Sequence, residues 1–238
     1  MFRSLSGFKV STQSLVAVFV IAFAVLTGST GQAQSTRKPS HETNANRKAR
    51  IARQVADTYS HRWEVGGGGG WLRFRSGEST QKNSEIAFWM DTTYYLNQKL
   101  GLTGELRGAY GNAKVPNYNS FATYVGNPQI SEYPFMAGPT YRVMLHEKSA
   151  ISVFALGGTA IGKFDGDSKG IPSTTLGFWP STNAAPAFSV GANYDLNIYP
   201  NLAFRIAPSY LGTTFGGSYQ SNVGFEAGLL YRFGHQKK

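Results

Sequence analysis

The chain has 238 residues, a formal net charge of +10 at pH 7 and no cysteine, which excludes a disulfide framework and a lipid-modified cysteine. The charge is uneven: residues 34–62 carry +5 and residues 63–238 only +3. Because the excess charge lies in a short leading segment, we expect no nucleic-acid partner.

The N-terminus has the pattern of a secretory signal peptide. Arg3 and Lys9 precede an apolar run over residues 15–26, and small residues follow up to Gly31-Gln32-Ala33. This order of a basic start, an apolar core and a small-residue cleavage site predicts a signal peptide over residues 1–33 and export from the cytoplasm. The run is shorter than the roughly 20 residues of a spanning helix, although an uncleaved anchor remains the alternative.

Residues 34–60 form a polar, basic segment that we predict to be a periplasmic leader. Residues 46–59 are good helix formers, but only Ile51 and Val55 could make an apolar stripe. The simplest interpretation is a solvated leader. The alternative is Coulomb attraction to anionic lipid head groups or lipopolysaccharide.

The first predicted strand contains a run of glycines at residues 66–70. A phosphate-binding loop would end in Gly-Lys-Ser/Thr, whereas Trp71-Leu72-Arg73 follows, so no nucleotide or other cofactor is predicted. Trp63 and Trp71 share one parity and could mark the two ends of a lipid-facing band. Because Leu72 and Phe74 have the opposite parity, we expect a bulge or an exit from the membrane there.

Seven more segments alternate as β-strands do, since successive side chains of a strand face opposite sides. In the clearest case, Ile86, Phe88 and Met90 share a face, and Ala87 and Asp91 share the other. Pro139 removes a ladder donor, so a bulge or weak pairing is expected beside it. The predicted strands lie within 86–96, 100–111, 133–145, 150–164, 188–198, 202–210 and 222–233.

Short connections alternate with long ones along these strands. Short turns fall near 97–99, 146–149 and 199–201, and longer polar links fall at 76–83, 112–131, 165–184 and 212–220. This alternation is typical of bacterial outer-membrane barrels, whose periplasmic turns are short and outer loops long. We therefore predict an all-β fold: an eight-stranded antiparallel up-and-down transmembrane β-barrel over residues 61–234, with a basic tail at 235–238. A soluble lipocalin-like barrel with its apolar face inward is the alternative.

The last strand carries a resemblance to a known family. Val223, Phe225 and Leu229 lie on an apolar face that ends in Tyr231 and Phe233. Together with Gly228, these two aromatics are similar to the C-terminal assembly signal of bacterial outer-membrane proteins, although a tail follows here. The resemblance implies insertion by the outer-membrane assembly machinery, contact with outer-membrane lipid and lipopolysaccharide, and a location in the outer membrane.

The pattern as a whole resembles small bacterial outer-membrane β-barrel proteins of the OmpA/OmpW-type porin-like superfamily. The nearest likeness is to uncharacterised acidobacterial barrel proteins, at residues 61–75 and 136–141. The resemblance implies the fold and no activity, and we expect a monomer.

Nine charged residues are predicted to face the interior of the barrel. Hairpin arithmetic places Asp91 opposite Glu105, with Arg107 on the diagonal to screen them. It also places Asp195 opposite Arg205, and closure of the barrel brings Glu64 toward Arg232. An eight-stranded interior is just wide enough for side chains to fill it, so these groups should pair. A gated path for protons or small solutes is the alternative. The nine residues are Glu64, Asp91, Glu105, Arg107, Arg142, Asp195, Arg205, Glu226 and Arg232.

No catalytic or metal site is predicted. The four histidines lie at 41, 61, 146 and 235, away from the outer loops, so we predict that the protein is not an enzyme. Residues 165–168, Asp-Gly-Asp-Ser, lack the further acidic positions of a calcium loop and indicate a turn.

Two classes of function remain. In the first, the barrel is structural or interacts at the surface through its outer loops, with an external partner that the sequence does not identify. In the second, it is a narrow channel or a carrier of small or hydrophobic solutes. For the first class, the expected outer-loop contacts are Tyr118, Phe121, Tyr124, Phe178 and Trp179.

Overall fold

The computed structural model describes residues 43–113 and 127–235. The predicted signal peptide, most of the basic tail and the first part of the leader lie outside these residues. The same holds for Tyr118, Phe121 and Tyr124, three of the five predicted loop contacts.

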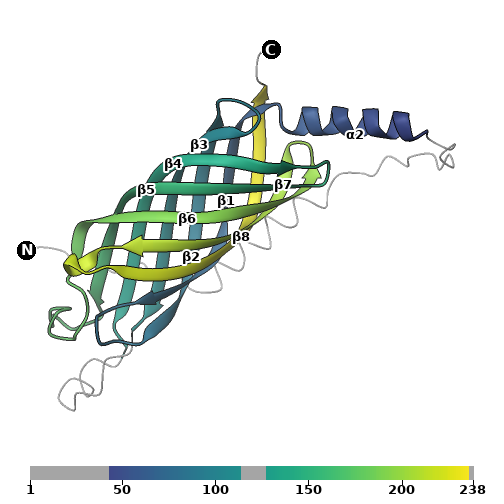
Figure 1. Cartoon of the computed structure of the whole chain (residues 1–238). Coiled ribbons are helices and arrows are strands. Elements are labelled where there is room, and N and C mark those ends of the chain that lie inside the picture. Colours follow the sequence, from purple (N-terminus) through teal and green to yellow (C-terminus); the bar gives the residue numbers. More distant parts are fainter. Residues whose placement is uncertain (1–42, 114–126, 236–238) are drawn as a thin grey trace, which may run out of the picture. The chain divides into compact units, whose positions relative to one another are not determined.

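Eight antiparallel strands close into one barrel in the order β1 to β8, each paired with its neighbours in the chain and β8 paired with β1 (Figure 1). This confirms the predicted fold class and strand number. The strands are β1 (His61–Arg75), β2 (Lys82–Tyr95), β3 (Leu100–Asn112), β4 (Gln129–Leu145), β5 (Ser149–Gly166), β6 (Thr182–Tyr199), β7 (Leu202–Thr213) and β8 (Gln220–His235).

The two faces of each strand differ as the alternation predicts. On β2, Ile86 is 79% exposed and Met90 56%, whereas Trp89 between them is only 2% exposed. On β8, Leu229 is 44% exposed and Leu230 is fully buried. Large apolar side chains therefore cover the outer wall of the barrel, and charged and small side chains occupy much of its interior.

The barrel has two different ends. At one, which we call the turn end, the connections are short: 96–99, 146–148 and 200–201. At the other, the loop end, they run over 76–81, 113–128, 167–181 and 214–219. Helix α2 (Asn44–Thr58) precedes β1, and the 3-10 helix η1 (Phe215–Gly217) lies in the last loop-end connection. Thr43 caps α2, with its hydroxyl accepting a hydrogen bond from the Asn46 amide at 3.4 Å.

The first and last strands meet at a seam that depends on glycine. Gly68 pairs with Gly228 across the seam. A Cβ atom at Gly68 would clash with the Ala227 carbonyl oxygen, and one at Gly228 would clash with the Gly67 carbonyl oxygen. The glycine run thus allows two backbones to approach more closely than side chains permit, which favours closure of the barrel.

Neither of the two bulges that the sequence allowed for is present. The register of β1 runs without a shift through Trp71↔Ile86 and Leu72↔Glu85, so no bulge precedes Phe74. The opposite parity of Leu72 and Phe74 arises because these two side chains are buried inside the barrel.

The β4–β5 register is the same before and after Pro139, from Ala137↔Gly157 to Thr140↔Phe154, so there is no bulge at this proline. Gly138 and Pro139 themselves have no partner on β5, which is the weak pairing expected beside a residue that lacks a ladder donor. The bulges in this pair lie instead between Gln129 and Ser131 and between Arg142 and Met144. Within the described residues, no helix is both long and apolar enough to cross a membrane.

Candidate functional site

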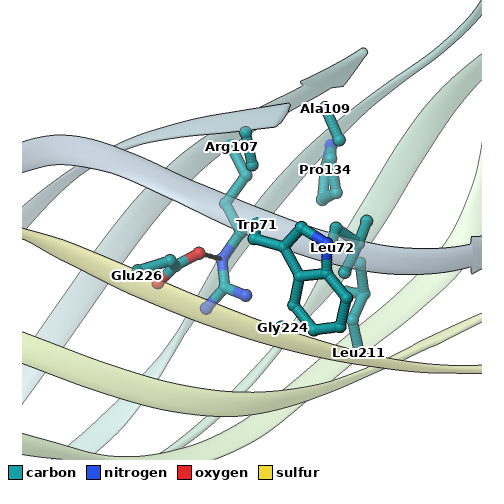
Figure 2. Close-up of a pocket in the computed structure, with 9 residues that line it drawn as sticks. Trp71, Leu72, Arg107, Ala109, Pro134, Leu211, Gly224 and Glu226 are labelled. Carbon is teal, nitrogen blue, oxygen red and sulfur yellow. Dashed lines mark ion pairs between the residues drawn. The ribbon is translucent and has the colours of Figure 1, made fainter. Parts of the chain in front are cut away.

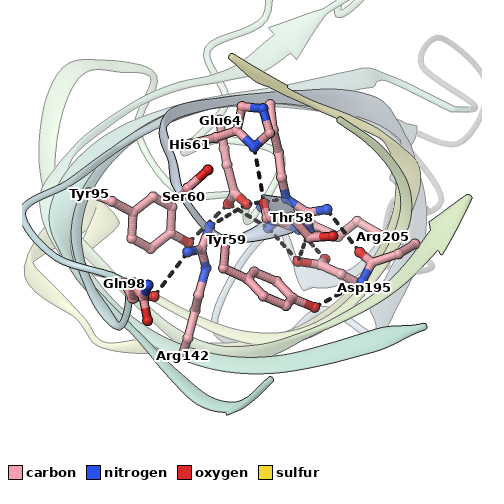
Figure 3. Close-up of polar contacts among 12 residues, drawn as sticks. Thr58, Tyr59, Ser60, His61, Glu64, Tyr95, Gln98, Arg142, Asp195 and Arg205 are labelled. Carbon is pink, nitrogen blue, oxygen red and sulfur yellow. Dashed lines mark hydrogen bonds and ion pairs between the residues drawn. The ribbon is translucent and has the colours of Figure 1, made fainter. Parts of the chain in front are cut away.

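The interior near the turn end is organised around Glu64 on β1, which is fully buried (Figure 3). Its Oε1 lies 2.6 Å from Arg142 Nη2 and 2.7 Å from Arg232 Nε. Its Oε2 accepts a hydrogen bond from the Tyr95 hydroxyl at 2.9 Å and lies 3.4 Å from Arg205 Nη2. One carboxylate therefore joins side chains from β1, β2, β4, β7 and β8.

Arg205 extends this network across the interior. Its Nε and Nη2 donate to the two carboxylate oxygens of Asp195 at 2.7 and 3.0 Å, which is the two-pronged geometry that suits a guanidinium. Its Nη1 donates to Asp91 at 2.8 Å. Arg205 is 2% exposed, so its charge is neutralised by carboxylates rather than by water.

Arg107 forms a second group nearer the middle of the barrel. Its Nε contacts Glu105 on the same strand and lies 3.0 Å from Glu226 Oε1 on β8. Its Nη1 donates to the Ser209 hydroxyl at 2.8 Å. The sequence predicted that Arg107 would screen Asp91 and Glu105 together. Instead Arg107 pairs with Glu105 and Glu226, and Arg205 pairs with Asp91.

Tyr59, between α2 and β1, covers the network at the turn end and is 1% exposed (Figure 3). Its hydroxyl donates to the backbone carbonyls of His146 at 2.9 Å and Ser149 at 3.2 Å, and accepts from Asn197 Nδ2 at 2.8 Å. The guanidinium of Arg142 lies 5.1 Å from its ring centroid. Burial raises the pKa of the Tyr59 phenol, so the residue is neutral at ordinary pH.

The interior near the loop end is apolar instead. Phe74, Phe164 and Phe215 are fully buried, with ring centroids 5.1 to 6.4 Å apart; the rings of Phe74 and Phe164 stack, and Phe215 meets both of them edge-on. Leu176 and Phe178 from the 167–181 connection join the same cluster. Side chains of the 167–181 connection and of η1 thus fold over the interior of the barrel and pack into it.

Two carboxylates lie in this half of the barrel without compensation. Glu85 and Glu132 are fully buried, and none of their four oxygens has a hydrogen-bond partner among the described residues. In the strand register, Glu132 on β4 lies opposite Ala109 on β3. Glu85 on β2 lies beside Gly111, the next residue of β3 on the same face as Ala109. A Cβ atom at Gly111 would clash with Glu85 Cγ, so the glycine makes room for the Glu85 side chain. The sequence signal for both glutamates is the alternation of β2 and β4. If it is continued one or two residues before the predicted start of each strand, it assigns both side chains to the interior.

Two small cavities lie between these groups in the described part of the barrel. A cavity of about 10 Å³ is lined by Leu72, Arg107 and Glu226 among others (Figure 2). A second, also about 10 Å³, lies beside Trp89 and Asp91. Each is about the size of a single water molecule.

The nine predicted interior charges all lie inside the barrel, and each pairs with at least one of the others. Five are acidic and four basic, which leaves one negative charge in excess. The exposed fractions of their side chains do not exceed 6%: Glu64, Asp91, Glu105, Arg107, Arg142, Asp195, Arg205, Glu226 and Arg232.

The two predicted loop contacts within the described residues differ from each other. Phe178 is 4% exposed and packs in the apolar cluster, so its assignment as an exposed contact is wrong. An alternation rule for strands gives no information about a loop that folds inward. Trp179 remains partly exposed, and its indole Nε1 donates to the Arg75 carbonyl at 3.0 Å.

The residues of the assembly signal lie on the last strand as the pattern requires. Tyr231 and Phe233 are 50% and 42% exposed on the outer wall and stack with ring centroids 6.1 Å apart. Gly228 lies at the β1–β8 seam. The acidic turn at 165–168 is hydrogen-bonded to a neighbouring segment, because Asp165 Oδ1 accepts a hydrogen bond from the Ser181 hydroxyl at 2.9 Å.

Neither a protein-family model nor a curated protein matches the chain. Solved structures do. The outer membrane protein OprG of Pseudomonas aeruginosa is 16% identical with a TM-score of 0.50, and the match covers 75% of this chain and 99% of OprG. Neisserial surface protein A is 11% identical with the same TM-score, covering 72% and 97%. Ail of Yersinia pestis is 17% identical with a TM-score of 0.47, covering 73% and 99%.

The chain has the fold of the small bacterial outer-membrane β-barrels. This agrees with the resemblance seen in the sequence. The nearer likeness to acidobacterial barrels stays a prediction. At these identities the similarity establishes the fold alone, so the function has to be argued from the side chains of this chain.

Proposed function

We propose that this protein is an integral membrane barrel of the bacterial outer membrane, closed to solutes, with a structural or surface-interaction role. The observation that carries the proposal is the filled interior. Paired charges occupy the half near the turn end and an aromatic cluster occupies the half near the loop end. An eight-stranded barrel has no room for a water-filled channel once large side chains occupy it.

The outer wall supports the membrane location. Side chains such as Ile86, Met90, Leu102 and Val143 are each more than half exposed, and they would be costly in water but favourable in lipid. In the outer membrane, the short connections of the turn end would face the periplasm and the loop end the outside. Tyr231 and Phe233 on the last strand suit recognition by the assembly machinery during insertion.

Conductance tests the proposal. The full chain is refolded into detergent, its folding is verified by heat-modifiable gel migration, and it is added to a planar bilayer in concentrated salt. We expect insertion without discrete current steps, because cavities of about 10 Å³ admit single waters only. Steady steps whose size rises with salt concentration would contradict the closed barrel and favour the narrow channel.

A further inference from the structure

A pocket of about 310 Å³ lies at the loop end, outside the filled interior. It is built from three segments: the end of β1 with the connection that follows it and the first residue of β2, the 167–181 connection, and the start of β8 with the residues before it. A volume of this order is the lower end of the range for small-molecule sites. The lining residues are Arg75, Glu78, Lys82, Trp179, Ser218, Tyr219, Gln220 and Ser221.

Trp179 is fixed in this pocket. Its indole Nε1 donates to the Arg75 carbonyl at 3.0 Å, and its backbone amide donates to the Ser76 carbonyl at 2.8 Å. These two bonds attach the 167–181 connection to the end of β1. Because the orientation of the indole is set before any ligand arrives, a ligand that packs on it does not have to order it.

Tyr219 supplies a second held aromatic ring. It is 55% exposed, and its ring stacks on Phe188 with a centroid distance of 6.1 Å and an interplanar angle of 12°. Its hydroxyl is hydrogen-bonded to the Tyr210 hydroxyl at 2.5 Å. An exposed aromatic ring held by both stacking and a hydrogen bond is a rigid surface for contact with a ligand.

The charged groups of the pocket are predominantly basic. Arg75 is exposed and Lys82 is half-buried, and Lys82 Nζ donates to the Ser221 carbonyl at 3.0 Å, which uses only one of its three protons. Glu78 is the single acid in the lining. A guanidinium and an ammonium in one pocket suit a phosphate, because both form charge-assisted hydrogen bonds with its oxygens.

We infer that this pocket binds a phosphorylated sugar. The C–H face of the sugar ring packs on Trp179 or Tyr219, and the phosphate meets Arg75 and Lys82. The same chemistry is offered by the phosphorylated head group of a glycolipid in the outer leaflet and by a free sugar phosphate. This inference rests on the proposed function, because it assigns a ligand class to the surface-interaction role.

Binding is measured by nuclear magnetic resonance on the full chain in an uncharged detergent, following the indole N–H resonance of Trp179, which Trp179→Phe identifies. Glucosamine 1-phosphate, glucosamine and inorganic phosphate are titrated in turn. We expect a saturable shift with glucosamine 1-phosphate and at least about tenfold weaker binding of the other two, since each lacks one half of the contacts. Equal binding of inorganic phosphate would overturn the sugar assignment.

Matched variants separate a built site from general attraction. Lys82→Gln should weaken glucosamine 1-phosphate binding by about tenfold, which corresponds to one charge-assisted hydrogen bond. Lys163→Gln removes an exposed lysine outside the pocket lining and should leave binding unchanged. If the two variants weaken binding equally, or if no shift saturates, the inference is wrong.

The same resonance distinguishes the two sources of ligand. In nanodiscs of phosphatidylcholine alone the Trp179 indole should keep its ligand-free position, and addition of soluble glucosamine 1-phosphate should shift it. If a phosphorylated glycolipid in the nanodisc produces that shift by itself, the lipid head group is the ligand. No shift in either case overturns the inference. It would leave the closed barrel untouched, since that is tested by conductance.

Discussion

Glu64 and Arg232 face each other across the seam where the first and last strands close the barrel, with Arg232 Nε 2.7 Å from Glu64 Oε1. The pair therefore links the two ends of the barrel sequence as well as neutralising two buried charges. Glu64 contacts Arg142 and Arg205 in addition, so its loss would leave three arginines short of a partner.

Glu64→Gln is expected to destabilise the folded barrel by about 3–5 kcal/mol, because it leaves buried arginines without their shared carboxylate. The measurement is urea unfolding of the refolded protein in micelles, followed by tryptophan fluorescence. Glu78→Gln, at an exposed position, is the control and should change the unfolding midpoint little. Equal unfolding midpoints for the two variants would show that the network does not depend on Glu64.

The direction of the side chains on β8 is tested by a pair of variants. Leu229→Arg places a charge on the outer wall and should cost roughly 2–4 kcal/mol in a lipid environment. Glu226→Gln weakens the pair with Arg107 inside the barrel and should cost less, since Glu105 still neutralises that arginine. A larger loss for Glu226→Gln would mean that the two faces are exchanged.

The same two variants also test the soluble alternative when they are unfolded in plain buffer. A lipocalin-like barrel would hold Leu229 in its core, and Leu229→Arg would then abolish folding without any lipid. For the membrane barrel, wild type itself should need detergent to stay in solution.

Glu132→Gln is expected to stabilise the protein, by about 1 kcal/mol or more, because it removes a buried group whose charge has no partner in the described residues. The amide keeps the shape of the side chain and adds a donor that can reach the neighbouring carboxylate. The unfolding midpoint in micelles should rise, in the opposite direction to the Glu226→Gln variant. A fall comparable to that of Glu64→Gln would show that Glu132 has a compensating partner.

Tyr59 gives a pH dependence at the turn end. Burial raises the pKa of its phenol above the ordinary value of about 10, so the folded protein favours the neutral form. The stability that Tyr59 contributes is therefore complete below about pH 10 and is lost as the pH rises through the folded value.

Tyr59→Phe removes the hydroxyl and should cost about 1 kcal/mol at neutral pH through its lost hydrogen bonds. The difference in unfolding free energy between wild type and Tyr59→Phe should then narrow above about pH 10. Tyr199→Phe, at a 62% exposed position, is the control. A difference that stays constant up to pH 11 would contradict a buried, neutral Tyr59.

The sequence predicted the strands and their faces because one physical rule governs them, the alternation of side chains along a strand. The pairings Asp91↔Glu105 and Asp195↔Arg205 follow from the same rule once the short turns are located. The β1–β8 pair Glu64↔Arg232 follows from closure.

The contacts that cross the interior could not be predicted in this way. Arg205 on β7 reaches Glu64 on β1 and Asp91 on β2, two strands with which β7 does not pair, and such contacts depend on side-chain rotamers and on the diameter of the barrel. The apolar half near the loop end was missed for a different reason. An interior of polar residues was assumed, and the inward fold of Phe178 from a connecting segment has no periodic signal.

The most direct test of a membrane-inserted barrel compares two tryptophans, one whose side chain faces outward and one whose side chain faces the interior. Trp71 is 39% exposed on the outer wall, and Trp89 is 2% exposed inside. Variants that retain only one of the two, with the others changed to phenylalanine, are reconstituted into vesicles of phospholipid brominated on its acyl chains. We predict strong quenching of Trp71 fluorescence by the brominated lipid and much weaker quenching of Trp89. Stronger quenching of Trp89 than of Trp71, or no quenching of either, would contradict the account.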